Sequence, residues 1–217
     1  MNFEQAHFNM VEQQIRPWDV LDPTVLDLLM LVKREDFVPA AYRIFAYSDT
    51  EIPLGQGASM LKPVIEGQAL QALQLKKHEK VLEVGTGTGY MAALLANHAQ
   101  QVWSVEIDPA LAEQARANLR KVGIDNVTVE VGDGLQGKPA EAPFDVIMVS
   151  GGVAEVPQAL LDQLKVGGRL FAIVGDFPIM EARLITRVDE TNFRSVNVLE
   201  THADMLKNGA GKPKFNF

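Results

Sequence analysis

The chain has 217 residues, of which 47% are apolar and 22% charged, with a formal net charge of −8 and a pI near 5.0. This composition is typical of one globular domain with a sizeable core. The acidic balance and the lack of a Lys/Arg cluster argue against a partner that is bound through nucleic-acid phosphates. The absence of cysteine excludes disulfides, thiolate catalysis and cysteine metal sites. No two of the four histidines have metal-ligand spacing, so we expect no metal site.

The N-terminal residues give no sign of export. They lack a basic segment followed by an apolar one, and no apolar run approaches the roughly 18 residues that a membrane helix needs. We therefore expect a cytoplasmic protein without membrane contact. The sequence does not indicate the oligomeric state.

Residues 1–78 are expected to form N-terminal helices and a long loop. Helical spacing of apolar residues predicts helices over 3–16, from Pro23 to about residue 32, and over 64–75. Asp22 is expected to cap the second helix, with Pro23 in its first turn. Residues 46–63 show no strand or helix period, and their prolines and glycines predict an extended loop that its apolar residues keep packed.

Residues 79–206 alternate between strands and helices. Strands are expected at 80–84, 101–106, 127–131, 144–149 and 168–174, helices at 89–97, 109–121 and 157–164, and a hairpin at 180–188 and 193–201. Such alternation implies a mostly parallel sheet that is covered on both faces. We expect a single domain over 1–217, with a doubly wound, seven-stranded α/β fold. It would carry an antiparallel C-terminal strand, an N-terminal helical cap and a mobile tail over 207–217.

The stretch Glu83-Val-Gly-Thr-Gly-Thr-Gly-Tyr90 combines a buried strand, a glycine-rich turn and a helix start. Its three alternate glycines let the backbone approach a ligand closely, and Thr88 is expected to cap the helix. The third glycine comes one residue earlier than in the dinucleotide pattern Gly-x-Gly-x-x-Gly. Glu83 would repel a diphosphate and favour a cationic ligand.

Two later strands end in acids. Glu106 lies 21 residues after Gly85, where a carboxylate can accept hydrogen bonds from both ribose hydroxyls. Asp133, between Gly132 and Gly134, can accept the amino group of an adenine. Because the carboxyl ends of parallel strands meet at one edge of the sheet, these signals together predict a cationic adenosine ligand, S-adenosylmethionine.

These motifs, together with Pro143-Phe-Asp-Val-Ile147 and Gly167-Gly168, resemble class I S-adenosylmethionine-dependent methyltransferases. The segments Arg34-x-Asp-Phe-Val-Pro39, Tyr47-x-Asp49 and Ile52-Pro-Leu-Gly-Gln-Gly57 resemble, more closely, protein-L-isoaspartate O-methyltransferases. The resemblance covers about residues 10–206. It implies a Rossmann-like methyltransferase fold and methyl transfer from S-adenosylmethionine to carboxylates of damaged aspartyl residues in proteins or peptides. The donor-binding residues that it implies are Ser59, Met60, Leu61, Glu83, Gly85, Thr86, Gly87, Gly89, Glu106, Ile107, Asp133 and Gly134.

The departures from the family pattern are concentrated where the family handles its substrate. The family's Gln-Thr-Ile-Ser-x-Pro is Ala58-Ser-Met-Leu-Lys-Pro63 here, so Leu61 stands at the active-site serine and Ser59 at the threonine. Ser59 is therefore the candidate catalytic side chain. Three functions stay open: an isoaspartyl methyltransferase that tolerates the change, a methyltransferase with a different small-molecule or protein acceptor, and a non-catalytic protein that binds the donor.

Overall fold

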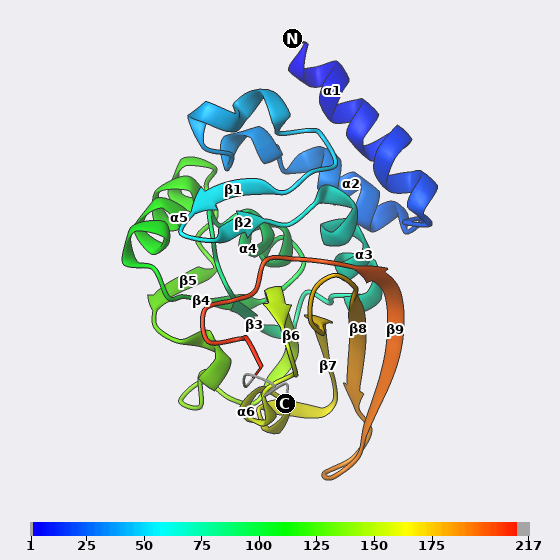
Figure 1. The fold of residues 1–217 in the computed structure, drawn as a ribbon, viewed down its shortest axis with the longest axis vertical. Coiled ribbons are helices and arrows are strands. Elements are labelled where there is room, and N and C mark those ends of the chain that lie inside the picture. The colour runs from blue at the N-terminus through cyan, green and yellow to red at the C-terminus, as the bar shows by residue number, and fades with distance from the viewer. Residues whose placement is uncertain (1, 212–217) are drawn as a thin grey trace, which may run out of the picture.

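The computed structural model describes residues 2–211, which form a seven-stranded sheet with helices on both faces (Figure 1). The spatial order of the strands is β5-β4-β3-β6-β7-β8-β9. Strands β3 to β7 are parallel, and β8 and β9 run antiparallel to their neighbours. The expected α/β fold is confirmed. The strands are β3 (Lys80–Val84), β4 (Gln101–Glu106), β5 (Val127–Val131), β6 (Phe144–Val153), β7 (Leu164–Val174), β8 (Met180–Arg187) and β9 (Phe193–Thr201).

Two hydrophobic layers sandwich the sheet, because successive side chains of a strand point to opposite faces. In β6, Val146 and Met148 join the larger layer, whereas Ile147 and Val149 join the smaller one. The larger layer includes side chains of α3 (Pro63–Leu73), α4 (Tyr90–Ala96) and α5 (Pro109–Lys121). The smaller layer includes α6 (Gln158–Asp162) and the 3-10 turn η5 (Gly134–Gln136). Both faces are therefore covered, as the nearly continuous apolar strands indicate.

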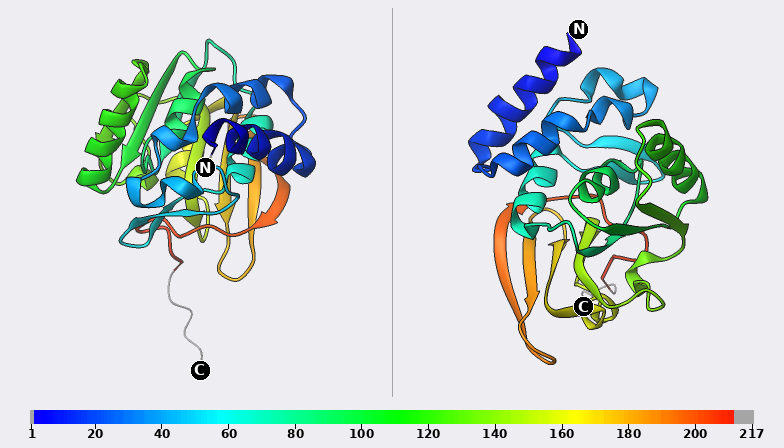
Figure 2. Two further views of the ribbon diagram at one scale, coloured as in Figure 1. Left: turned by 90° about the horizontal axis from the view of Figure 1, so that it is seen from above. Right: turned by 180° about the vertical axis from the view of Figure 1, so that it is seen from behind.

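The N-terminal helices gather at one end of the sheet, where α2 (Pro23–Leu31) contacts α3 (Figures 1 and 2). The helix expected over 3–16 is present but changes its hydrogen bonding: α1 (Phe3–Asn9) continues into the π-helix η1 (Met10–Ile15) and the 3-10 turn η2 (Arg16–Trp18). Helix α2 begins as predicted, since the Asp22 carboxylate accepts a hydrogen bond from the backbone of Thr24. Two 3-10 turns, η3 (Arg34–Asp36) and η4 (Ala40–Phe45), follow it.

The segment expected as a plain loop over 46–63 contains a β-hairpin instead. Strand β1 (Ile52–Gly55) pairs antiparallel with β2 (Ala58–Met60), and Gln56 and Gly57 form the turn at positive φ. The two strands are short, and their register shifts between Pro53 and Gly55, so an alternating pattern cannot develop in the sequence. The hairpin was missed for this reason.

The order of the strands reverses at β3. The chain runs outward from β3 to β4 and β5, and then returns to the other side of β3 as β6. Open α/β sheets bind ligands at such a switch point, outside the carboxyl ends of the strands. The carboxyl end of β3 therefore marks the candidate site.

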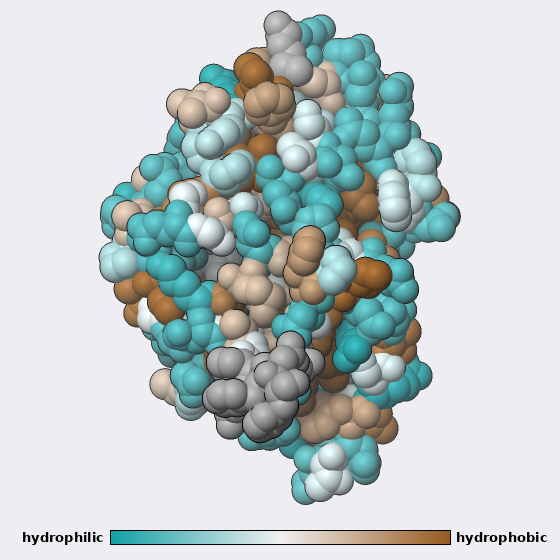
Figure 3. Space-filling model, in the orientation of Figure 1, coloured by the Kyte–Doolittle hydropathy of each residue, from teal (hydrophilic) through white to brown (hydrophobic). Residues whose placement is uncertain are grey.

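The face of the molecule that is seen in Figure 1 is largely hydrophilic. Figure 3 shows apolar residues near the centre of the face, among hydrophilic ones. Within residues 2–211, no helix has both the length and the hydropathy to cross a bilayer.

Candidate functional site

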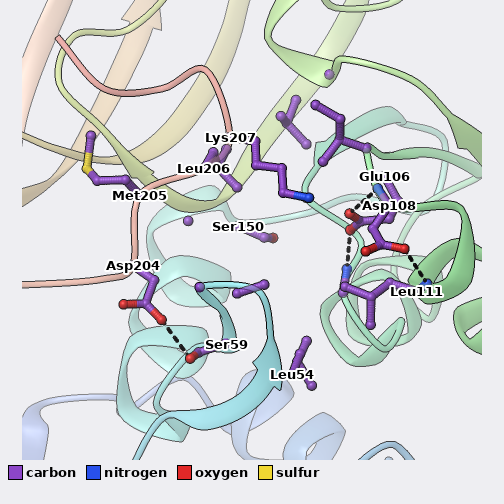
Figure 4. Close-up of a pocket in the computed structure, with 18 of the residues that line it drawn as sticks. Leu54, Ser59, Glu106, Asp108, Leu111, Ser150, Asp204, Met205, Leu206 and Lys207 are labelled. Carbon is purple, nitrogen blue, oxygen red and sulfur yellow. Dashed lines mark hydrogen bonds between the residues drawn. The ribbon is translucent and has the colours of Figure 1, made fainter.

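A pocket opens at the carboxyl ends of β3, β4 and β5, and the space between its walls, open solvent included, is about 900 Å³. The β1–β2 hairpin and the segment that follows β9 complete its walls (Figure 4). The predicted residues that line it are Ser59, Met60, Leu61, Gly85, Gly87, Glu106, Ile107, Asp133 and Gly134. A smaller inner pocket adjoins it and shares the hairpin residues 59–61. Glu83 and Thr86 line the inner pocket, whereas Gly89 lines neither.

The glycine-rich turn adopts the backbone that its sequence predicts. Gly85, Gly87 and Gly89 have φ values of +89°, +53° and +89°, which side chains disfavour. A Cβ atom at Gly85 would lie 3.0 Å from Cδ2 of Leu206, so the C-terminal segment packs closely against this glycine. The hydroxyl of Thr86 lies 2.6 Å from the hydroxyl of Ser104.

The start of helix α4 differs from the expectation. Gly89 precedes the helix, and no side chain caps it. Thr88 is buried, and its Oγ1 has no hydrogen-bond partner among the described residues. The predicted cap at Thr88 is wrong, because the left-handed conformation of Gly89 places one more residue between Thr88 and the helix.

Glu83 lies at the floor of the site and is fully buried. The hydroxyls of Ser104 and Ser150 both donate to its carboxyl group. Burial raises the pKa of Glu83 to about 8 against these two hydrogen bonds, which lower it. At neutral pH the carboxyl therefore holds its proton for most of the time, and a neighbouring cation would favour its release. The negative charge that the sequence predicts at Glu83 thus depends on the ligand.

Glu106 ends β4 and is almost completely buried. Its Oε2 accepts a hydrogen bond from the backbone N–H of Gly87 at 2.8 Å, and its Oε1 accepts one from Asp108 at 3.0 Å. Each carboxylate oxygen has a further lone pair, and Glu106 lines the pocket beside Ile107. The two backbone amides fix the carboxylate in an orientation that leaves acceptor capacity for a ligand.

Asp133 follows β5 on the same side of the pocket. Its Oδ1 accepts a hydrogen bond from the backbone of Leu135 at 3.0 Å. A Cβ atom at the next residue, Gly134, would lie 2.7 Å from Cγ1 of Val84. The lack of a side chain at Gly134 therefore lets this turn approach the end of β3 and keeps the pocket open between them.

The hairpin brings residues 59–61 to the pocket. The hydroxyl of Ser59 donates to the carboxylate of Asp204 at 2.7 Å (Figure 4). Leu61 is buried at the position where the family pattern has serine, and its carbonyl accepts a hydrogen bond from Arg34 at 2.6 Å. Beside Ser59 and its acidic partner, the segment presents two apolar side chains, Met60 and Leu61, to the pocket.

The inner pocket is lined in part by buried polar atoms that lack a hydrogen-bond partner among the described residues. Oε2 of Glu66, Oγ1 of Thr88 and the hydroxyl of Tyr90 all line it and form no hydrogen bond within the described residues. Glu66 is paired with the buried Arg34, whose Nε lies 3.4 Å from Oε2. Burial nevertheless raises the pKa of Glu66 to about 7, against the lowering effect of Arg34. The interior beside the site is therefore polar and carries a titratable group.

The C-terminal segment 204–208 was not predicted as part of the site. Besides Asp204, its Lys207 donates to Gln56 of the hairpin at 3.4 Å, and its Asn208 donates to Oδ2 of Asp133 at 3.1 Å. Figure 4 shows Asp204, Met205, Leu206 and Lys207 of this segment among the residues that line the pocket. Lys207 and Asn208, at the start of the tail that is expected to be mobile, both contact the site. The mobility of the tail stays a prediction, and residues 212–217 lie outside the described part of the chain. The only local signal was the departure from the family pattern at 202–205.

The comparison with known proteins decides the family. The model of the protein-L-isoaspartate(D-aspartate) O-methyltransferase family matches residues 5–202. The chain belongs to this family. It is 44% identical to protein-L-isoaspartate O-methyltransferase 1 of Syntrophobacter fumaroxidans, over 85% of this chain and 86% of that protein. It is 46% identical to the protein-L-isoaspartate O-methyltransferase of Methanoculleus marisnigri, over 76% of each chain.

Solved structures of protein-L-isoaspartate O-methyltransferases have the same fold. One superposes with a TM-score of 0.76 at 28% identity, covering 93% of this chain and 65% of that one. A putative member from Plasmodium falciparum, solved with S-adenosyl-L-homocysteine, superposes with a TM-score of 0.78 at 20% identity, over 91% of this chain and 96% of that one. The resemblance read from the sequence is confirmed. At the position where the family pattern has serine this chain has Leu61, and its Ser59 contacts Asp204.

Proposed function

We propose that this protein is an S-adenosylmethionine-dependent protein-L-isoaspartate O-methyltransferase that acts on carboxylates of damaged aspartyl residues. One observation carries the proposal: the glycine-rich turn, Glu106 and Asp133 converge on a single pocket at the switch point of the sheet, in a chain of this family. Each of the three signals alone is weak in the sequence. Their convergence in space supports one adenosine ligand.

The residues of the pocket fit the proposed donor. We infer that Glu106 accepts hydrogen bonds from the ribose hydroxyls through the lone pairs that its backbone partners leave free. Asp133 would accept the adenine amino group beside the space that Gly134 leaves open. The turn over 85–89 and Glu83 would hold the methionine end, together with residues 59–61. S-adenosylmethionine supplies, when bound, a methyl group that its sulfonium activates.

The proposed reaction needs alignment more than acid–base chemistry. A carboxylate oxygen forms a bond to the methyl carbon while the carbon–sulfur bond breaks, and the electron pair of that bond stays on sulfur. No proton leaves the acceptor, so no general base is required. A residue that holds the carboxylate in line with the methyl group can therefore supply much of the rate. Ser59 is the hydroxyl that the hairpin presents to the pocket, and we infer that it positions the acceptor.

A transfer assay tests the proposed function. A synthetic peptide with one isoaspartyl residue and the same peptide with normal aspartate would be incubated with radiolabelled S-adenosylmethionine. We expect a base-labile methyl ester on the isoaspartyl peptide only. Calorimetry with S-adenosylhomocysteine would test donor binding separately, and no heat of binding would show that the donor assignment is wrong.

A second acceptor class is favoured by Leu61, which removes the family's serine hydroxyl from the site. If S-adenosylhomocysteine binds but neither peptide is methylated, the acceptor is a different protein group or a small molecule. A methyl-release assay over a panel of metabolites would then identify its class. If the donor product binds and no acceptor is found, the protein binds the donor without catalysis.

The remaining expectations concern the binding partners and the cellular location. We infer that the physiological partners are proteins or peptides that carry isoaspartyl residues. The lack of nucleic-acid binding and the cytoplasmic location expected from the sequence stay predictions.

A further inference from the structure

The contact between Ser59 and Asp204 joins two parts of the chain that are 145 residues apart. Ser59 lies in β2, and Asp204 lies in the segment that follows β9. Both residues line the large pocket, and Ser59 also lines the inner one. In Figure 4 the two side chains point toward each other at the edge of the site. The contact therefore sits where the donor pocket opens to an acceptor.

The direction of this hydrogen bond determines what the site can bind. A serine hydroxyl has one proton, and here it is donated to Asp204 at 2.7 Å. An ionised carboxylate has no proton to give. The Oγ of Ser59 consequently offers only lone pairs to a ligand, and a group that binds there must be a hydrogen-bond donor.

The surroundings strengthen this requirement. Glu51 lines the same pocket, and it lies 3.8 Å from His202. Burial raises the pKa of Glu51, and Asp204 raises it further against the lowering effect of His202, as expected where two carboxylates are near each other. An acceptor carboxylate that met Ser59 and Asp204 directly would be repelled. A hydrogen-bond donor of the substrate must therefore lie between the acceptor carboxylate and the Ser59–Asp204 pair.

We propose that Asp204 orients the hydroxyl of Ser59 so that its oxygen accepts the backbone N–H of the isoaspartyl residue, which positions the neighbouring carboxylate for methyl transfer. This inference rests on the proposed function. Asp204 acts through Ser59 and is a positioning residue. The chain of hydrogen bonds from N–H to hydroxyl to carboxylate runs in one direction, so each bond strengthens the next.

The chemistry of the isoaspartyl residue fits this geometry. Its peptide chain continues through the side chain, so the free carboxylate is the α-carboxylate, attached to the same carbon as the backbone N–H. In a normal aspartyl residue one more carbon separates the free carboxylate from that carbon. A single acceptor that binds the N–H therefore places the isoaspartyl carboxylate at a different point from an aspartyl one. The pair would add to the discrimination between the two.

A substrate lacking only the N–H tests the inference. The isoaspartyl peptide would be compared with its ester analogue, in which an oxygen replaces the N–H of the isoaspartyl residue, and kcat/KM would be measured for both. In the unaltered protein we expect the amide peptide to be favoured at least about fivefold, because the ester oxygen meets the lone pairs of Ser59. In Ser59→Ala and Asp204→Asn this preference should fall to about twofold or less. The Asp204→Asn change keeps one acceptor oxygen and replaces the other by an NH₂ donor, so the amide can donate to Oγ of Ser59 and the hydroxyl can turn its proton to the ester oxygen.

Glu200→Gln is the matched control, because it removes an exposed carboxylate of β9 that lines neither pocket and should retain the preference for the amide. Calorimetry with S-adenosylhomocysteine would show that each variant still has a folded donor site. An Asp204→Asn variant that slows both peptides equally, and so keeps the ratio, would overturn the inference and leave the proposed function intact. Donor binding without methylation of either peptide by the unaltered protein would instead overturn the proposed function, and this inference with it.

Discussion

Two buried glutamates of the site, Glu106 and Glu83, have different hydrogen-bond partners. The carboxylate of Glu106 accepts two backbone N–H groups, which fix its orientation. Glu83 receives hydrogen bonds from two serine hydroxyls, but full burial outweighs them and raises its pKa to about 8. Glu106 is therefore suited to bind neutral hydroxyls, and Glu83 is suited to respond to a cation.

Glu106→Ala tests the first of these roles. The change removes the proposed acceptor of the ribose hydroxyls and leaves the N–H groups of Gly87 and Asp108 without it. We expect the affinity for S-adenosylhomocysteine to fall at least about tenfold, measured by calorimetry. Glu130→Gln is the control: this residue lies in the neighbouring strand β5, pairs with Lys138 and should leave the affinity unchanged. Equal affinities for the two variants would mean that Glu106 does not contact the donor.

At the scale of elements, one arginine ties the N-terminal part to the site. Arg34 is fully buried, and its guanidinium donates to the carbonyls of Ala46 at 3.0 Å and Leu61 at 2.6 Å. Its Nε faces Glu66 of helix α3, and its guanidinium lies 5.7 Å from the ring centroid of Tyr90. The turn η3, the hairpin and two helices thus meet at one side chain, which holds residues 59–61 against the inner pocket.

Arg34→Met is expected to destabilise the protein strongly. It leaves the buried Glu66 without a cation and two carbonyls without donors, and breaking a buried pair in this way costs about 3 to 5 kcal/mol. Urea unfolding would measure the loss. Arg43→Met removes an exposed partner of Glu35 and should cost less than about 1 kcal/mol. The double change Arg34→Met with Glu66→Leu should recover part of the stability, and no recovery would show that the unpaired acid is not the cause.

The elements of the sheet could be predicted closely, because each strand of the core carries its own apolar run. Strands β3, β4, β5 and β9 and helix α5 begin and end where the sequence predicts. The β1–β2 hairpin could not be predicted, since strands of four and three residues are too short to show a period.

Some residues of the site could likewise be predicted from local sequence patterns, and others could not. Gly85, Glu106 and Asp133 lie at strand ends, so spacing along the chain is enough to find them. Asp204 and Asn208 reach the site from a segment whose contacts with Ser59 and Asp133 span 145 and 75 residues. No local pattern carries such contacts. The pairing of Arg34 with Glu66 was missed for the same reason.

For the whole molecule, the formal charge of −8 counts every carboxyl group as ionised. In the folded protein, not all of these carboxyl groups are ionised at neutral pH. Burial raises the pKa of Glu66 to about 7 and that of Glu83 to about 8, both from a usual value of 4.5. The folded protein therefore holds protons at pH values where the unfolded chain has released them.

This difference gives the stability a definite dependence on pH. Between about pH 5 and pH 8 the folded state binds more protons than the unfolded state, so the free energy of unfolding should decrease as pH rises. The slope is up to about 1.4 kcal/mol per pH unit for each proton. Asp145 and Asp189, whose pKa values are lowered, finish titrating below this range. Urea unfolding at about pH 6 and about pH 8 would measure the decrease, and the Glu66→Gln/Glu83→Gln double variant should lose most of it, because glutamine does not titrate. Equal slopes for the two proteins would mean that these two carboxyls are ionised in the folded state.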